Sequence, residues 1–239
     1  MKSVLVKVLR THPKKGNQFW QSFEYDGELD VPISAVLDEI NSREKMIDTN
    51  LDVATPILWE CSQSATPCGT CAMVINHVPR LACSTILSDV LINGEVEIRP
   101  LTKFTIVADL KVDRTVMSEG LRDMKIWLEK EALVDLNNPE EQMEISKCLA
   151  CGCCLEACPN YSGDADFVGA MAANEAYTAY KQATDPDHIE EIKKKYKKKF
   201  FNGCSKSLIC EKVCPMGIPL SSDMSKVSSL SVWRIWQQK

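Results

Sequence analysis

The sequence predicts an α+β fold of two domains, the first spanning residues 1–108 and the second residues 109–239. Apolar and polar residues alternate with the period of a strand in several stretches of the first hundred residues, and the period becomes helical beyond Val112. The cysteines divide in the same way, with one group ending at Cys83 and the rest beginning at Cys148. A chain of 239 residues is long enough for two modest domains that each bury a core.

The elements of the first domain follow from this alternation in chain order. Strands are predicted over Ser3–Arg10 and over Phe19–Tyr25, which together form a hairpin. Pro32 then opens a helix, in which four apolar residues share one face: Ile33, Val36, Leu37 and Ile40. Further strands are expected over Ala72–Asn76 and Val96–Arg99. This order is typical of the small mixed sheet of a plant-type ferredoxin, the β-grasp fold.

The second domain is predicted to be all-α. Its first helix carries apolar residues at helical spacing: Met117, Leu121, Met124 and Leu128. Two more helices are predicted over Ala170–Ala183 and Asp187–Lys199. The boundary between the domains is therefore expected near residue 108.

Five cysteines lie in the segment Cys148–Cys158. Four of them have the spacing C-x2-C-x2-C-x3-C and precede Pro159, which is the cysteine run of bacterial ferredoxins. Three thiolates at this spacing each bind one iron of a 4Fe-4S cluster, and the fourth is directed to a second cluster. The second domain is therefore predicted to be of the bacterial ferredoxin type.

A second run ends at Cys214 and is incomplete, because Ser207 stands where its second cysteine would be. Exchange of the fourth ligands between the runs gives a 4Fe-4S set of Cys148, Cys151, Cys154 and Cys214. The remaining set is Cys158, Cys204 and Cys210. Three thiolates suit a 3Fe-4S cluster, because the iron without a ligand is the one that is lost. The alternative is a fourth iron bound by the Ser207 hydroxyl, which is a poor ligand.

The first domain has a cysteine group of its own, formed by Cys61, Cys68, Cys71 and Cys83. A C-x2-C pair with one cysteine before it and one distant cysteine after it resembles plant-type 2Fe-2S ligation. The usual gap before the pair is four residues, and here it is six, so Cys61 depends on a longer loop. A Rieske centre is disfavoured, because it needs two histidine ligands and His77 is expected in the turn of a hairpin.

Zinc and disulfides are the competing explanations for so many cysteines. C-x2-C pairs also build structural zinc sites, but zinc has no need of two interlocked ferredoxin runs. Disulfides are disfavoured, because the N-terminus has no secretory signal and the thiols are expected to stay reduced. Cys153 belongs to none of the three ligand sets and is expected to be a small buried residue.

The overall charge limits the classes of partner. The net charge of -5 and the pI near 5.4 argue against nucleic acid. No apolar run approaches the roughly 18 residues that a membrane-spanning helix needs. If the protein works at a membrane, a partner is expected to bring it there.

The order of 2Fe-2S, 4Fe-4S and 3Fe-4S ligands resembles the iron-sulfur subunit of succinate dehydrogenase and fumarate reductase, the respiratory complex II family. The resemblance extends over the segments CGTCAMVINHVPRLAC, IRPL to ADLKVD, CLACGCCLEACPNY, DFVGAMAANEAY and CPMGIPL. Its most specific element is the incomplete second run with Ser207, because ordinary two-cluster ferredoxins keep that ligand. The main alternative, a heterodisulfide-reductase-like or glycolate-oxidase-like subunit, tends to have two complete runs.

The resemblance implies an electron-transfer role in a respiratory oxidoreductase. The partners would be a flavoprotein catalytic subunit and one or more membrane-anchor subunits, which would hold FAD, a quinone and, in some members, haem. The subunit would lie on the cytoplasmic side of the inner or cytoplasmic membrane, held there by the anchor. Succinate oxidation or fumarate reduction would take place in the flavoprotein, so no catalytic acid, base or nucleophile is assigned to this chain.

The resemblance is weakest around the expected quinone pocket. Many relatives have tryptophan after the Cys-Pro of the first run and histidine after the cysteine that matches Cys204. This sequence has Asn160 after Pro159, and Ser205 after Cys204. Pro159, Tyr161 and Lys226 are the remaining candidates for the pocket, and Lys226 is equally well explained as a solvated helix residue.

Overall fold

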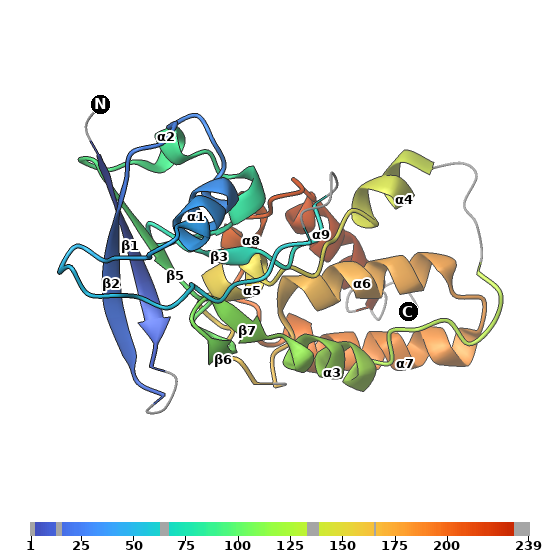
Figure 1. Ribbon diagram of the computed structural model, residues 1–239. Helices are drawn as coiled ribbons and strands as arrows, with labels where there is room; N and C mark the ends of the chain where they lie inside the picture. The colour runs from blue at the N-terminus through green and yellow to red at the C-terminus, as the bar shows by residue number, and fades with distance from the viewer. Residues whose placement is uncertain (1–2, 13–15, 63–66, 133–138, 165, 232–239) are drawn as a thin grey trace. The chain divides into compact units, whose positions relative to one another are not determined.

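The computed structural model describes residues 3–12, 16–62, 67–132, 139–164 and 166–231. The chain divides into two compact units, Met1–Asp113 and Arg114–Lys239. Figure 1 shows the strands in the first unit and most of the helices in the second. The boundary expected near residue 108 falls within a two-stranded hairpin, formed by β6 (Thr105–Ala108) and β7 (Lys111–Asp113), which belongs to the first unit.

The first unit is built on a five-stranded sheet with the order β2-β1-β5-β3-β4. Its strands are β1 (Val4–Thr11), β2 (Gln18–Tyr25), β3 (Ala72–Ile75), β4 (Val78–Leu81) and β5 (Glu95–Arg99). β1 and β2 form the predicted antiparallel hairpin, whereas β1 pairs with β5 in parallel. Alternate residues of β1 are buried, as the period of a half-buried strand requires.

Helix α1 (Ile33–Ser42) lies alongside this sheet (Figure 1). Pro32 precedes its first residue, and the four apolar residues predicted on one face are all buried. Two shorter pieces complete the unit: the 3-10 turn η1 (Ala82–Ser84) and helix α2 (Leu87–Val90). The predicted helix of this unit is therefore confirmed together with its buried face.

The turn between β3 and β4 consists of Asn76 and His77, whose φ angles are 46° and 66°. Two positive φ angles are the mark of a two-residue hairpin turn, for which asparagine is favoured. The Asn76 side-chain oxygen accepts a hydrogen bond from the backbone of Glu97 at 2.8 Å, which fastens the turn to β5. His77 is exposed, as expected for a turn residue.

The second unit contains helices α3 (Thr115–Asp123), α4 (Pro139–Ile145), α5 (Cys153–Ala157), α6 (Gly169–Gln182), α7 (Pro186–Tyr196), α8 (Ile209–Lys212) and α9 (Leu220–Ser231). A π-helical turn, η2 (Lys197–Phe201), continues α7. Helix α6 packs against α3, α4, α5, α7 and α9, and much of its buried surface is alanine. No strand occurs among the residues of this unit that the structure describes, so the prediction of an all-α domain is confirmed.

The first predicted helix of this unit was placed too broadly. Val112 lies in β7, and the helix starts at Thr115. It stops at Asp123, because Lys125 takes a left-handed conformation with φ 60° that a helix cannot continue. Leu128 therefore lies beyond the helix and is 38% exposed.

No helix in the described part of the chain is both long and apolar enough to cross a membrane.

Candidate metal centres

The β3–β4 hairpin brings two of the predicted 2Fe-2S ligands together. Cys71 precedes β3, and Cys83 lies in η1 directly after β4. The backbone N–H of Ala82 donates to the carbonyl oxygen of Cys71 at 3.1 Å, and the two thiols interact through a hydrogen bond. Burial raises the pKa of Cys71 to about 11, and the nearby Cys83 thiol contributes to the rise. A thiol pair with one buried member is suited to metal, because bonding to a cation relieves the cost of a buried thiolate.

The third predicted ligand, Cys68, lies on the surface. The Ser62 hydroxyl donates to its sulfur at 3.0 Å, and the Thr70 hydroxyl lies 3.1 Å from it. These two hydroxyls lower the pKa of Cys68 to about 6, which favours its thiolate form. Ser62 also follows Cys61 directly. The contact therefore places the neighbour of Cys61 at the Cys68 sulfur, although six residues separate the two cysteines.

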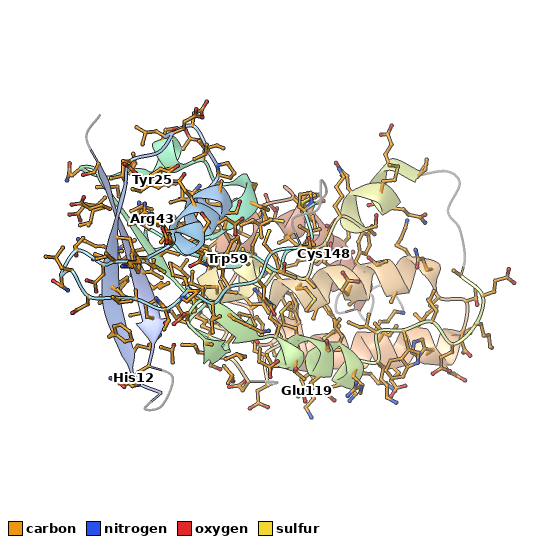
Figure 2. All side chains as sticks on the ribbon, in the orientation of Figure 1. His12, Tyr25, Arg43, Trp59, Glu119 and Cys148 are labelled. Atoms are coloured by element: carbon orange, nitrogen blue, oxygen red, sulfur yellow. The ribbon has the colours of Figure 1, made fainter. Side chains whose placement is uncertain are left out.

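A cavity in the second unit is lined by all four predicted 4Fe-4S ligands: Cys148, Cys151, Cys154 and Cys214. The rest of its wall is mostly apolar, including Leu149, Met171, Pro215, Ile218 and Leu220. Cys148, labelled in Figure 2, has its pKa raised to about 12 by burial, and Cys151 and Cys214 are among the groups that raise it further. Burial also raises the pKa of Cys154 well above its ordinary value, and the nearby thiols again add to the rise. The structure therefore brings these four residues to one apolar cavity.

The three predicted 3Fe-4S ligands are also neighbours. Cys158 follows α5, Cys204 follows η2, and Cys210 lies in α8. Burial raises the pKa of Cys210 to about 11, and the electrostatic effects of Cys158 and Cys204 contribute to this rise. Residues from both cysteine runs thus interact at this position, as the predicted exchange of fourth ligands requires.

The two cysteine runs share two positions with positive φ. The four positions of the first run recur 56 residues later as Cys204, Ser207, Cys210 and Cys214. In both runs the residues on each side of the second position have positive φ: 47° at Ala150 and 89° at Gly152, then 59° at Lys206 and 56° at Leu208. Such values are uncommon outside glycine, so both loops are held in one particular shape. Ser207 therefore occupies the backbone position that Cys151 occupies in the first run.

Within the described residues, no three side chains of histidine, cysteine, aspartate or glutamate converge as the ligands of a single metal ion do. In a 4Fe-4S or 3Fe-4S cluster each cysteine binds a different iron, and in a 2Fe-2S cluster each iron is bound by two cysteines, so ligand sulfurs on different irons remain further apart than the ligands of a single ion. The cysteines described above have the donor chemistry and the grouping that clusters require.

Three polar groups beside the 4Fe-4S set were not foreseen from the sequence. The Cys153 thiol is fully buried, as expected, but it also donates a hydrogen bond to the Cys151 sulfur, which lowers the pKa of Cys151 to about 7. The Arg114 side-chain Nε donates to the Cys151 carbonyl oxygen at 3.2 Å, and its charge also lowers that pKa. Glu175 of α6 hydrogen-bonds to Cys148. Of these three groups, only Cys153 has a local sequence signal, because it lies next to the proposed ligand Cys154.

The candidates for a quinone pocket lie in different surroundings. Tyr161 is buried, Pro159 is exposed, and Lys226 of α9 pairs with Glu141 of α4 at 2.5 Å. The Lys226 ammonium also lies 5.6 Å from the centre of the Tyr177 ring, so it is held in place rather than simply solvated.

The two residues that depart from the family pattern contact each other. The Ser205 hydroxyl donates to the Asn160 side-chain oxygen at 2.6 Å.

Comparison with known proteins supports both parts of the chain. Residues 5–119 match a 2Fe-2S iron-sulfur cluster binding domain, and residues 144–218 match a 4Fe-4S dicluster domain. The succinate dehydrogenase iron-sulfur subunit of Bacillus subtilis is 29% identical over 220 residues, which cover 87% of this chain and 86% of the relative. The fumarate reductase iron-sulfur subunit of Wolinella succinogenes is 31% identical over 66% of this chain and 70% of its own length.

A solved structure has the same fold. A chain of the Mycobacterium smegmatis Sdh1 complex in the apo form superposes with a TM-score of 0.75, over 98% of this chain and 97% of that chain, at 20% identity. The predicted fold class, a 2Fe-2S ferredoxin domain followed by a helical dicluster domain, is therefore confirmed.

Replacement of Cys61 tests the least regular of the predicted ligands. We expect Cys61→Ala to abolish or strongly alter the electron paramagnetic resonance signal of the 2Fe-2S cluster, because the cluster loses one of four thiolates. The signals of the second unit should be unchanged. Cys153→Ala, a cysteine change outside the three sets, should retain the 2Fe-2S signal. An unaltered 2Fe-2S signal in Cys61→Ala would remove Cys61 from the site.

Replacement of Arg114 tests its electrostatic effect on the 4Fe-4S site. A nearby cation favours the more negative, reduced state, so Arg114→Gln should lower the midpoint potential by roughly 50–100 mV at an effective dielectric constant near 20. Arg114→Lys should restore most of the shift. Arg122→Gln, an exposed change on the same helix, serves as the control. Equal potentials in wild type and Arg114→Gln, measured by titration with resonance detection, would exclude this effect.

Proposed function

The chain belongs to the family of iron-sulfur subunits of succinate dehydrogenase and fumarate reductase, and on this basis we propose that it conducts electrons between a flavoprotein and a membrane quinone. Members of this family are electron-transfer subunits. The proposal adds that the chain holds three clusters and that the electron path continues to a quinone.

The proposed ligand sets are those predicted from the sequence. Cys61, Cys68, Cys71 and Cys83 would hold a 2Fe-2S cluster, and Cys148, Cys151, Cys154 and Cys214 a 4Fe-4S cluster. Cys158, Cys204 and Cys210 would hold a 3Fe-4S cluster. When bound, such clusters supply one-electron redox chemistry at potentials set by their charge, hydrogen bonding and exposure. The observation that best supports the proposal is that cysteines of both runs lie near each other. Cys154 of the first run interacts with Cys214, and Cys210 of the second run interacts with Cys158.

The protein groups around the sulfurs have separate roles in this proposal. The hydroxyls of Ser62 and Thr70 stabilise the thiolate of Cys68 and orient it. The apolar wall around Cys148 and Cys154 excludes water. Cys153 donates a hydrogen bond to the Cys151 sulfur, and hydrogen bonds to ligand sulfur raise a cluster's potential because they stabilise the added negative charge.

The direction of the path rests on family membership. The 2Fe-2S domain would face the flavoprotein, which holds FAD and converts the dicarboxylate. The centre at Cys158 would face the quinone of a membrane-anchor subunit, which in some members also holds haem. Pro159 directly follows that ligand, and Tyr161 lies three residues after it. These two residues are the candidates to line the quinone pocket, and Lys226 is a further candidate. The anchor would hold this subunit at the cytoplasmic side of the membrane.

Purification of the native complex tests the whole proposal. We expect a flavoprotein and a membrane-anchor subunit to copurify with this chain, and the preparation to oxidise succinate or reduce fumarate with a quinone as well as with an artificial dye. Its visible spectrum should bleach on addition of dithionite. A colourless, zinc-containing preparation would contradict the proposal, as would copurification with a heterodisulfide-reductase-like partner.

Ser207 is proposed to determine the type of the third cluster. Three soft ligands hold three irons, and no cysteine retains a fourth. Ser207→Cys should favour a 4Fe-4S cluster with a lower potential, because cluster type and net charge set the potential. Electron exchange with quinone should then slow, whereas activity with an artificial dye changes less. Ser207→Ala, which also lacks the thiol, should keep the near-isotropic resonance of an oxidised 3Fe-4S cluster.

Iron counting and Mössbauer spectra of anaerobically prepared wild type provide the decisive control. If they revealed two 4Fe-4S clusters, with Ser207 or water on the fourth iron, the assignment of the third centre would be wrong.

A further inference from the structure

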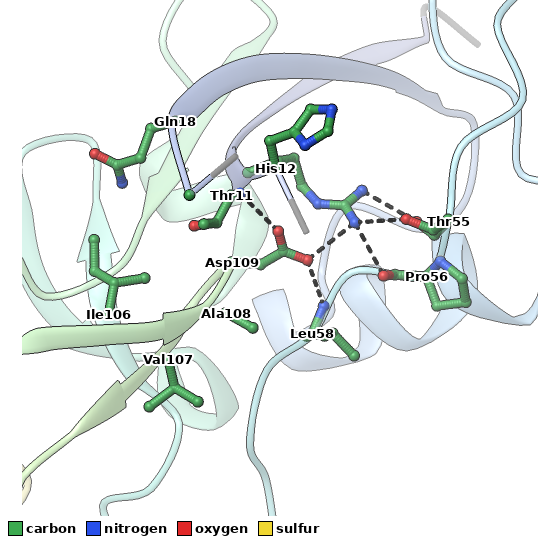
Figure 3. Close-up of a pocket in the computed structure, with 12 residues that line it drawn as sticks. Thr11, His12, Gln18, Thr55, Pro56, Leu58, Ile106, Val107, Ala108 and Asp109 are labelled. Atoms are coloured by element: carbon green, nitrogen blue, oxygen red, sulfur yellow. Dashed lines mark hydrogen bonds and ion pairs between the residues drawn. The ribbon is translucent and has the colours of Figure 1, made fainter. Parts of the chain in front are cut away.

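The segment that leads to Cys61 has no regular secondary structure. Residues 54–62 belong to no helix or strand, and the side chains of Thr55, Pro56 and Leu58 are exposed. Only Ile57 is deeply buried in the stretch from Thr55 to Leu58. The segment also borders an open cavity of about 690 Å³, shown in Figure 3. Apolar packing therefore does little to hold this segment, and its position must depend on polar contacts.

Asp109 supplies the central contacts, as Figure 3 shows. One carboxylate oxygen accepts a hydrogen bond from the backbone of Thr11 at 2.8 Å, at the end of β1. The other accepts from the backbone of Leu58 at 2.9 Å and also pairs with Arg10 at 2.9 Å. The side chains of Asp109 and Arg10 are only 4% and 5% exposed. This buried carboxylate therefore joins β1, the irregular segment and the β6–β7 turn.

Arg10 contacts the same segment at Thr55 and Pro56, before the Leu58 that Asp109 binds. Its guanidinium donates to the carbonyl oxygens of Thr55 at 3.1 Å and Pro56 at 3.0 Å, and to the Thr55 hydroxyl at 3.2 Å. It also donates to Gln21 of β2 at 2.9 Å. A buried ion pair is expensive unless its remaining donors and acceptors are satisfied, and most of these are bonded.

Further contacts continue toward the cysteine. Asn41 of α1 both donates to and accepts from the backbone of Ile57, at 2.9 and 2.8 Å. The backbone N–H of Leu110 donates to Leu58 at 3.0 Å, and the Lys111 ammonium pairs with Glu60 at 2.6 Å. Trp59, labelled in Figure 2, separates Leu58 from Glu60 in the sequence. Glu60 is the residue immediately before Cys61.

We propose that the buried pair Arg10–Asp109 positions Cys61 for the first metal centre. Both residues act through the backbone from Thr55 to Glu60, and neither touches the ligand itself. The proposal deepens the proposed function, because it rests on Cys61 being a ligand. It also accounts for how Cys61 can be held despite the long gap to Cys68, since the segment before Cys61 is fixed up to Glu60.

Asp109→Asn is the direct test, because it keeps the shape of the side chain and removes its charge. We expect iron to leave the 2Fe-2S site roughly tenfold faster in the presence of a chelator, the scale typical of lost outer contacts to metal ligands. The 2Fe-2S resonance should broaden as Cys61 becomes less fixed. The clusters of the second unit should retain their resonances, which a general loss of folding would not allow.

Two further variants keep the test decisive if Asp109→Asn fails to accumulate, since it leaves Arg10 buried without a counter-ion. Arg10→Gln combined with Asp109→Asn removes both charges and should give the same fast iron loss in a folded protein. Lys111→Ala removes only a half-exposed contact to Glu60 and should give a smaller effect of the same kind. Glu97→Gln, which removes an ion pair with Arg99 on β5, should leave the 2Fe-2S site unchanged.

The outcomes separate this inference from the proposed function. If wild type shows a 2Fe-2S resonance that Cys61→Ala destroys, but the double variant matches wild type in iron loss and line shape, the positioning role is wrong. If wild type shows no 2Fe-2S resonance, or Cys61→Ala leaves it intact, the proposed ligand set fails, and the positioning role fails with it.

Discussion

Burial of cysteine sulfur is the constraint on which the second unit depends. Burial raises the pKa of Cys148 to about 12 and of Cys210 to about 11, so burial disfavours the thiolate form of both. Metal binding requires thiolates, and a thiolate in an apolar wall is costly unless a cation or a donor compensates it. The hydrogen bond from Cys153 and the charge of Arg114 supply part of this compensation at Cys151. These two contacts reduce the cost of a thiolate at Cys151, as a cluster held by the proposed ligands would require.

The small residues of α6 make this arrangement possible. Alanine occupies much of its buried surface, so neighbouring helices can approach closely. Gly169 at its start has φ 73°, and a Cβ atom there would meet Leu155 of α5 at 2.1 Å. Helix α5 carries Cys154 of the proposed 4Fe-4S set and leads to Cys158 of the proposed 3Fe-4S set. The close approach of α6 therefore holds α5 in place between these two proposed centres. In the first unit polar contacts have the corresponding role, because the segment before Cys61 lacks an apolar face.

Much of this protein could be predicted from local sequence patterns. Period-two alternation identified the β1–β2 hairpin, and Pro32 with four apolar residues identified α1. Cysteine spacing within each run indicated which thiols would be neighbours, because that spacing is a local property of the sequence. The ferredoxin pattern indicated that the last cysteine of each run would lie near the other run. Contacts between distant residues were missed: Arg114 with Cys151, and Asp109 with Arg10 and Leu58. The end of α3 was also missed, because Leu128 continued the helical period while the left-handed conformation of Lys125 had no glycine to signal it.

The exchange of ligands between the two runs has a consequence for biogenesis. With the proposed sets, the ligands of the first centre are complete once Cys83 has been synthesised, and its unit ends at Asp113. The centre with three thiolates needs Cys210, and the 4Fe-4S centre needs Cys214, so neither can be filled before these residues have been synthesised. With these sets, a nascent chain that has not yet reached Cys210 can hold a complete centre in the first unit only. A chain truncated before Cys204 would lose ligands from both later centres while keeping the first one intact.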